Sequence, residues 1–442
     1  MSAAELAPVL ISGGSALLLA ARMAFWSKSV PAQEVSSAEI AGAAPVALRA
    51  AVLTFAEPLM TNYMLASVGL ASPKIGYPTL EWWDYSRHGL TAQFHMLPGQ
   101  SINDWTDRAT LAALSDSLGA REVTATRPDP GFVRLEVRVF DTLAVPAALP
   151  VAVHNGVGFG AVPDLEAVPL GVTENGDVWS IPVLYTHLLL SGKTGSGKSG
   201  VVQALFAGLA PAIRAGLVDL WVIDPKGGME FGRGEKLFTR FAFATIEDIL
   251  ALLAEAVHEL DERQARLKAA GLRKLVPTVE DPLVVVFIDE AATLSAFANR
   301  KQREQFEELH GLLLSKGRAP GFSVIETVID PSKDTVPQRQ LFPYRIGLKL
   351  SEPTQVAMIF GPGAVERGAR CTEIPDSTPG VAYVEQEGSS DILRVRSFLV
   401  TDDDIDAIVQ AYAPQPRPLV IDADDTARDE GDEGETGVAV AA

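Results

Sequence analysis

The chain has 442 residues, of which 47% are hydrophobic and 21% are charged. This length and composition exclude a disordered chain and a small disulfide scaffold, and they provide for two or three domains with a large buried core. The single cysteine, Cys371, cannot form an internal disulfide, which suits a reducing cytosol. The net charge of −19 disfavours nucleic-acid binding, but −10 of it falls from Thr401 onward, so any basic surface must be local.

The N-terminal region, residues 1–72, is apolar and predicted to be helical. Residues 6–21 are uncharged, and Arg22 and Lys28 follow them, as in an anchor whose C-terminal side is cytoplasmic. The run is shorter than the roughly 20 residues that span a bilayer. We therefore expect a cytoplasmic protein in which this segment is either a membrane contact or a helix buried in an oligomer. A second apolar stretch, residues 46–70, has the spacing of a packed amphipathic helix.

Residues 73–145 are predicted to form a small α/β domain. Ser101 and Asp104 are a capping pair, which predicts a helix that runs to Leu118. Alternating apolar residues predict strands at 90–97, 122–126 and 132–140. Pro146 and Pro150 then indicate a linker.

Residues 146–412 are predicted to form the main α/β domain. Apolar strands alternate there with helical stretches, which is typical of a mainly parallel sheet covered by helices. The tail, residues 413–442, is rich in Pro, Asp, Glu and Gly with few large apolar residues, and we expect it to be disordered.

A glycine-rich loop lies between a predicted strand at 187–190 and a predicted helix at 201–209. It matches the pattern GxxxxGK[ST], in the strand-to-helix context that this motif requires. Its glycines let backbone N–H groups turn inward around phosphate oxygens, and the helix N-terminus adds partial positive charge. Lys198 is predicted to reach the β- and γ-phosphates of ATP, and the Ser199 hydroxyl to ligate Mg²⁺. The residues predicted to bind the nucleotide are Gly192, Lys193, Thr194, Gly195, Ser196, Gly197, Lys198 and Ser199.

A second motif follows residues 283–288, a continuous apolar run typical of a strand buried on both faces. The run ends in Asp289 and Glu290. The aspartate is predicted to hold Mg²⁺, and the glutamate to polarise a water for in-line attack on the γ-phosphate. Glu290 therefore indicates hydrolysis rather than binding alone.

A third motif, Asp-Pro-Lys-Gly-Gly-Met-Glu-Phe at 224–231, follows another buried strand. With it, the chain resembles the FtsK/SpoIIIE family of hexameric DNA translocases, and within that family the transfer proteins of actinobacterial conjugative plasmids and integrative elements. The likeness covers about residues 165–412. Further matching segments lie at 315–321, 330–334, 341–346, 361–364 and 378–380.

The resemblance implies a RecA-like motor that assembles as a homo-oligomeric ring, most simply a hexamer, and pumps double-stranded DNA through its centre. In such rings an arginine from a neighbour completes the nucleotide site. Arg318 and Arg345 each match an arginine of the family pattern, and for each a structural ion pair is the alternative. Sequence-independent contacts to the DNA backbone are expected from loop residues such as Lys226, Lys301, Arg303 and Lys333.

Three features depart from the family pattern. Ile329 stands where a polar glutamine usually senses the γ-phosphate, and Thr327, on the same strand face, is the residue that can partly replace it. The roughly thirty residues after Tyr412 are too few and too acidic for us to expect in them the winged-helix module of the chromosomal members, and we expect at most one weak membrane span. Of these departures, Ile329 leaves the coupling between hydrolysis and movement open.

Two other functions stay open beside a DNA translocase. A protein-secretion ATPase of the type VII kind would share both nucleotide motifs, although such proteins usually carry several ATPase domains and this chain has one P-loop. An ATP-binding ring scaffold with weakened hydrolysis is suggested by Ile329, although the presence of Lys198, Ser199, Asp289 and Glu290 argues against it.

Overall fold

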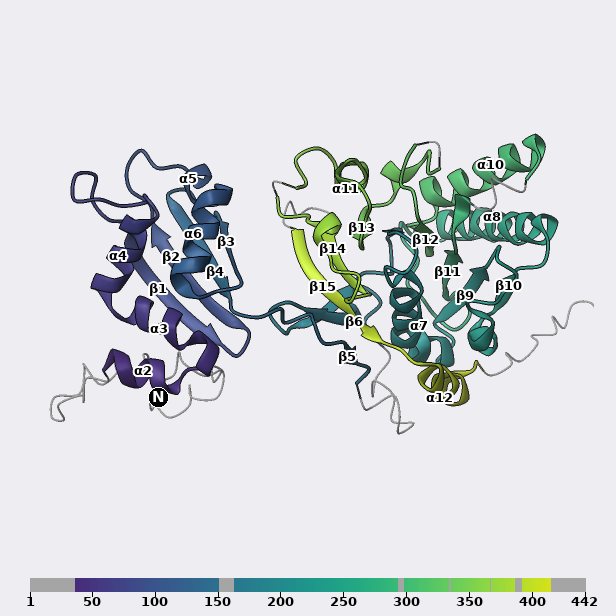
Figure 1. Cartoon of the computed structure of the whole chain (residues 1–442). Helices are drawn as coiled ribbons and strands as arrows, with labels where there is room; N and C mark the ends of the chain where they lie inside the picture. The colour runs from purple at the N-terminus through teal and green to yellow at the C-terminus, as the bar shows by residue number, and fades with distance from the viewer. Residues whose placement is uncertain are drawn as a thin grey trace, which may run out of the picture.

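The computed structural model describes residues 36–150 and 163–414, apart from 293–297, 334, 366 and 386–391. The described chain folds into two lobes, an N-terminal one in purple and blue and a larger one from teal to yellow (Figure 1). The apolar run at 6–26 and the acidic tail from 415 onward lie outside the described residues. Within the described ranges no helix is both long and apolar enough to cross a membrane.

The N-terminal lobe is a four-stranded antiparallel sheet in the order β1-β2-β4-β3, covered by helices. Its strands are β1 (Thr79–Ser86), β2 (Gly89–His95), β3 (Glu122–Thr126) and β4 (Phe132–Arg138), and its helices are α2 (Ser37–Ala43), η1 (Val46–Leu48), α3 (Arg49–Ala56), α4 (Pro58–Ser67), α5 (Ile102–Thr106) and α6 (Arg108–Leu118). The early helices and the sheet share one hydrophobic core, which includes Leu48, Phe55, Leu65, Phe94 and Trp105. The division predicted at residue 72 therefore does not separate two cores.

Two helices predicted as continuous are each broken in two. Within the apolar stretch at 46–70, one helix ends at Ala56 and the next begins at Pro58. The break lies there because proline cannot donate the backbone hydrogen bond of a helix interior. The capping box of Ser101 and Asp104 is present, but α5 is short. Asp107 then caps α6 by accepting from the N–H groups of its first turn.

The larger lobe is built on an eleven-stranded sheet, counted over the described residues. Its order is β10-β9-β11-β12-β8-β13-β14-β15-β6-β7, with β5 (Ala147–Ala148) paired to β15. The bounds are β6 (Val168–Thr173), β7 (Val178–Ile181), β8 (Leu188–Ser191), β9 (Val218–Ile223), β10 (Arg240–Ala242), β11 (Leu283–Ile288), β12 (Phe322–Val328), β13 (Tyr344–Gly347), β14 (Val381–Glu385) and β15 (Ile392–Leu399).

This sheet is mixed rather than mainly parallel. The strands from β10 to β13 run parallel, whereas β14, β15, β6 and β7 pair antiparallel. Parallel neighbours need a long crossover, while β6 and β7 are joined by a short turn that allows only antiparallel pairing. The expectation of a mainly parallel sheet thus holds for the half that carries the nucleotide motifs.

Helices cover both faces of the sheet, so its central strands are buried on both sides (Figure 1). On one face, α7 (Lys198–Arg214) and α12 (Asp402–Tyr412) pack into one hydrophobic core. On the other, α8 (Ile246–Ala269), α10 (Arg300–Lys316) and α11 (Pro353–Phe360) pack into a second. The 3₁₀ helices are η3 (Gly232–Leu237), η4 (Arg339–Leu341) and η5 (Cys371–Glu373).

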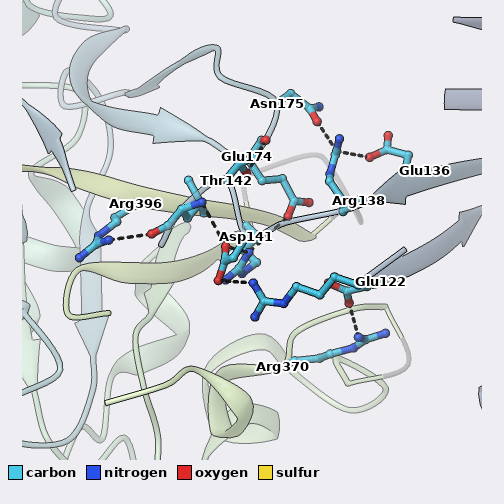
Figure 2. A network of polar contacts seen from close by, with 12 residues as sticks. Glu122, Glu136, Arg138, Asp141, Thr142, Glu174, Asn175, Arg370 and Arg396 are labelled. Carbon is cyan, nitrogen blue, oxygen red and sulfur yellow. Dashed lines mark hydrogen bonds and ion pairs between the residues drawn. The ribbon is translucent and has the colours of Figure 1, made fainter. Parts of the chain in front are cut away.

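Ion pairs tie the two lobes together around Asp141, which follows β4 (Figure 2). Arg394 of β15 binds both carboxylate oxygens of Asp141, at 2.9 and 3.0 Å, and Arg121 of the N-terminal lobe lies 3.0 Å from one of them. Arg370 of the larger lobe pairs with Glu122 of β3. The lobes are therefore joined by charge rather than by the linker alone.

Candidate nucleotide-binding and hydrolysis site

The P-loop connects β8 to α7, as its sequence predicts. Gly195 and Gly197 have φ angles of 79° and 98°, a left-handed conformation that side chains disfavour. A Cβ at Gly197 would also collide with the backbone of Gly380. The segment around Gly380 is in fact part of the loop's support, because its N–H donates to Ser196 O at 2.9 Å.

The Lys198 side chain folds back over the loop, and its Nζ donates to Gly192 O at 2.6 Å. Burial lowers the pKa of Lys198, although the nearby carboxylates of Glu290 and Asp289 oppose this. Ser199 is the second residue of α7 and is half-buried. Lysine and hydroxyl thus stand at the helix N-terminus, where phosphate groups bind well.

Asp289 and Glu290 follow β11 directly, and both are buried, at 4% and 5% exposure. Asp289 Oδ2 lies 2.8 Å from Lys226 Nζ, and its Oδ1 accepts from Thr327 Oγ1 at 2.7 Å. Glu290 Oε1 accepts from the N–H of Ile329 at 3.2 Å, while its Oε2 has no hydrogen-bond partner among the described residues. Burial raises the pKa of Glu290, which improves it as a proton acceptor.

Lys226 was predicted to contact DNA, but in the structure its ammonium group binds the Asp289 carboxylate at this site. Burial alone would lower its pKa, but the hydrogen bond and charge of Asp289 outweigh burial and raise it. The parallel pairing of β9 with β11 sets Ile223 opposite Ile288, so the residues that follow both strands meet at one edge. Had β9 been assigned as the parallel neighbour of β11, Lys226 and Asp224 could have been predicted to lie beside Asp289.

Thr327 lies on β12, the neighbour of β11, and Ile329 follows directly after that strand. The Thr327 side chain is fully buried and bound to Asp289, so it is engaged within the protein and not directed to solvent. The Ile329 side chain is 40% exposed. The position where relatives usually carry a glutamine is therefore open at the surface here.

The structure brings neither predicted arginine to the P-loop of its own chain. Arg318 precedes β12, and its Nε donates to the carbonyl of Tyr185, ahead of β8, at 2.7 Å. Arg318 and Tyr185 thus lie at the amino ends of the parallel strands β12 and β8, whereas the P-loop follows the carboxyl end of β8. Arg345, within β13, donates to the carbonyls of Phe342 and Ile359 at 3.0 and 2.7 Å, and burial lowers its pKa.

The other basic residues predicted to contact DNA are exposed, and no contact to the P-loop or the acidic pair is seen for them among the described residues. Lys301 and Arg303 belong to the first turns of α10 rather than to a loop. Lys333 lies in the segment after β12.

Comparison with known proteins agrees with the resemblance predicted from the motifs. Residues 164–280 match the FtsK/SpoIIIE family. The chain is 31% identical to the protein Tra of Streptomyces lividans over 234 residues, which is 49% of this chain and 36% of that protein. It is 28% identical to the transfer protein TraSA of Streptomyces ambofaciens over 345 residues, or 71% and 76% of the two chains. The chain thus spans about a third of Tra and three quarters of TraSA.

The fold resembles a solved structure as well. The pCW3 conjugation coupling protein TcpA, in a monomer form with ATPγS, has a TM-score of 0.52 and 18% identity, and the match covers 79% of this chain and 97% of that one. At this identity the likeness concerns the fold alone.

Proposed function

Since this chain carries an FtsK/SpoIIIE-family domain at residues 164–280, we propose that it is an ATP-driven double-stranded DNA translocase. We further propose that it works as a homo-oligomeric ring, most simply a hexamer, in conjugative or mobile-element DNA transfer. The observation that carries the proposal is the meeting of the P-loop with a buried Asp289–Glu290 pair at one sheet edge. The name of the Streptomyces ambofaciens relative, transfer protein TraSA, supports the biological setting.

The donor set of the site fits Mg–ATP. The P-loop backbone and Lys198 bind the phosphates, and the oxygens of Ser199 and Asp289 are the ligands that Mg²⁺ prefers. When bound, Mg²⁺ neutralises charge on the phosphate oxygens. Glu290 Oε2 accepts a proton from a water whose oxygen bonds to the γ-phosphorus. The bond from that phosphorus to the bridging oxygen breaks, and ADP leaves with the electron pair.

A neighbouring chain is proposed to supply the missing arginine. Arg318 is the better candidate, because it lies at the opposite edge of the sheet from its own P-loop. Both arginines are half-buried and donate to backbone carbonyls of their own chain, so a role in trans competes with these contacts for either residue.

DNA binding is proposed to be independent of sequence. Phosphate contacts from scattered exposed residues such as Lys301, Arg303 and Lys333 carry no base information. Affinity should then be alike on unrelated duplexes and fall steeply between 50 and 200 mM salt, by roughly 10³-fold if six phosphates are contacted. A preference for one duplex that persists at high salt would contradict this and indicate a sequence-reading element.

One experiment separates the proposed function from its alternatives. ATP hydrolysis is measured with and without linear duplex DNA, alongside the mass of the assembly. Stimulation by DNA together with a ring-sized mass supports a translocase. Hydrolysis that ignores DNA favours a protein-secretion ATPase, and nucleotide binding without hydrolysis favours a scaffold. Either of those results overturns the proposal.

We also propose a cytoplasmic location with membrane contact through the N-terminal apolar run at residues 6–26. Flotation with anionic lipid vesicles would be compared between the full chain and a chain that begins at residue 36. If both chains remain with the soluble fraction, the membrane contact is refuted.

A further inference from the structure

The hydroxyl of Thr327 joins the two acidic residues of the proposed hydrolytic site. It donates to Asp289 Oδ1 at 2.7 Å and accepts from the backbone N–H of Glu290 at 3.0 Å. A hydroxyl has a single proton to donate, and here that proton is used on Asp289. Thr327 therefore does not donate to a phosphate in this arrangement, and a direct γ-phosphate sensor is not the role that its contacts favour.

The position of Thr327 follows from strand register. In the parallel pairing of β11 with β12, Ile288 lies opposite Glu326, so the next residues, Asp289 and Thr327, face each other across the strand ends. Thr327 is fully buried, so water does not compete for its hydroxyl. The contact to Asp289 is thus fixed by the sheet and does not depend on a mobile loop.

Glu290 needs such support, because its φ angle of 46° lies in the left-handed region that a non-glycine residue occupies only at an energetic cost. Two contacts hold it there, one from the Thr327 hydroxyl of β12 to its N–H and one from the N–H of Ile329, just after β12, to its Oε1. The second carboxylate oxygen, Oε2, is then left without a protein partner among the described residues. This is the oxygen that is available to accept a proton from water.

We propose that Thr327 is a positioning residue whose single hydroxyl fixes the Mg²⁺ ligand Asp289 and the general base Glu290 relative to each other. The proposal rests on the proposed ATPase function. Lys226 holds the other oxygen of Asp289, so the carboxylate is clamped on both sides. Partners of a metal ligand that do not touch the metal typically change metal affinity or activity by about 10–100-fold when removed.

The test compares Thr327→Val, which keeps the shape and removes the hydroxyl, with Thr327→Ser, which keeps the hydroxyl. Ser323→Ala is the matched control, because Ser323 lies on the same strand, is fully buried, and its hydroxyl has no hydrogen-bond partner among the described residues. For each variant, kcat and KM for ATP are measured, together with the Mg²⁺ concentration that half-saturates binding of a fluorescent ATP analogue.

Thr327→Val should lower kcat by about 10–100-fold and raise the half-saturating Mg²⁺ concentration, with a smaller change in KM. Thr327→Ser and Ser323→Ala should stay close to the wild type. If Thr327→Val does not fold, Thr327→Cys replaces it, since a thiol is only a weak donor. Wild-type kcat and Mg²⁺ dependence in a folded Thr327→Val or Thr327→Cys protein would overturn the proposal, as would a loss that Thr327→Ser shares.

The hydrolysis measurement tests the proposed ATPase function, and the Mg²⁺ dependence of nucleotide binding tests the role of Thr327 independently of it. A wild-type protein that binds Mg-nucleotide without hydrolysing it would refute the proposed ATPase. The Mg²⁺ dependence of binding would still decide whether Thr327 positions Asp289.

Discussion

Lys198 and Glu290 act on different parts of the proposed reaction, so their substitutions should separate binding from hydrolysis. Lys198→Ala removes the cation that holds the β- and γ-phosphates, and both tight ATP binding and turnover should be lost. Glu290→Gln keeps the size of the side chain but cannot accept the proton of water, so ATP binding should persist while turnover falls by roughly 10²-fold or more. Binding is measured with a fluorescent ATP analogue and turnover by phosphate release. Normal hydrolysis by Glu290→Gln would refute its role as the base.

At the scale of secondary-structure elements, a buried acid–base pair joins helix α10 to strand β12. His310 Nε2 lies 3.0 Å from Glu326 Oε2, and the two side chains are 7% and 1% exposed. The ring of Phe306 stacks on His310 at 5.3 Å between centroids. Glu326 is the neighbour of Thr327, so this pair fixes α10 against the strand that supports the hydrolytic site.

Removing the histidine should therefore destabilise the protein. His310→Ala removes a buried ring that stacks on Phe306 and lies beside Glu326, and the cavity left behind should cost about 3 kcal/mol of unfolding free energy. His258→Ala is the matched control, because His258 faces solvent and pairs with Glu262 on the same helix, where loss of the pair costs at most about 0.5 kcal/mol. Urea unfolding of the three proteins gives the comparison. Equal effects of the two substitutions would contradict a structural role for the buried pair.

At the scale of the whole molecule, the contact between the lobes should depend on pH through Asp141. Burial alone would raise the pKa of Asp141, but the hydrogen bonds and charges of Arg394 and Arg121 outweigh it and lower the pKa from 3.8 to about 2. Because the pKa is depressed in the folded state, this stabilisation is present above pH 3.8 and is lost as the pH falls from 3.8 to about 2.

Asp141→Asn should thus lower stability by about 2 kcal/mol at pH 7, and the difference from the wild type should shrink below pH 4. Urea unfolding at pH 7, 5 and 3 measures it, with Asp261→Asn at an exposed helix position as the control. A difference that stays constant across this range would show that the ion pairs of Asp141 do not hold the lobes together.

The ring proposal makes its own prediction, because neither Arg318 nor Arg345 contacts the P-loop of its own chain in the described structure. Arg318→Ala and Lys198→Ala chains should each be inactive, since an arginine supplied in trans contributes roughly 10³-fold or more in rate. Mixed before assembly, the two chains should regain turnover, because some sites then combine an intact P-loop with an intact arginine. The same cross is made with Arg345→Ala. No recovery in either mixture, with both single variants assembled and inactive, would exclude an arginine supplied in trans.

The sequence alone determined the features that depend on neighbours in the chain. The P-loop between β8 and α7, the buried run of β11 and the capping box at Ser101 all follow from local residue patterns, because glycine conformation, hydrophobic periodicity and capping hydrogen bonds act over a few residues. The helix breaks at Pro58 and Asp107 are also local signals, although apolar periodicity obscured them.

Only the tertiary structure decided which distant segments meet. The antiparallel pairings of β13 with β14 and of β15 with β6 join segments that are distant in sequence, and residue patterns do not encode them. The same is true of the core that the early helices share with the N-terminal sheet. The same holds for the site, where Lys226 and Thr327 reach Asp289 from the ends of β9 and β12. These contacts arise because parallel strands bring their carboxyl ends to one edge, and strand order is fixed by packing of the whole sheet rather than by any single strand.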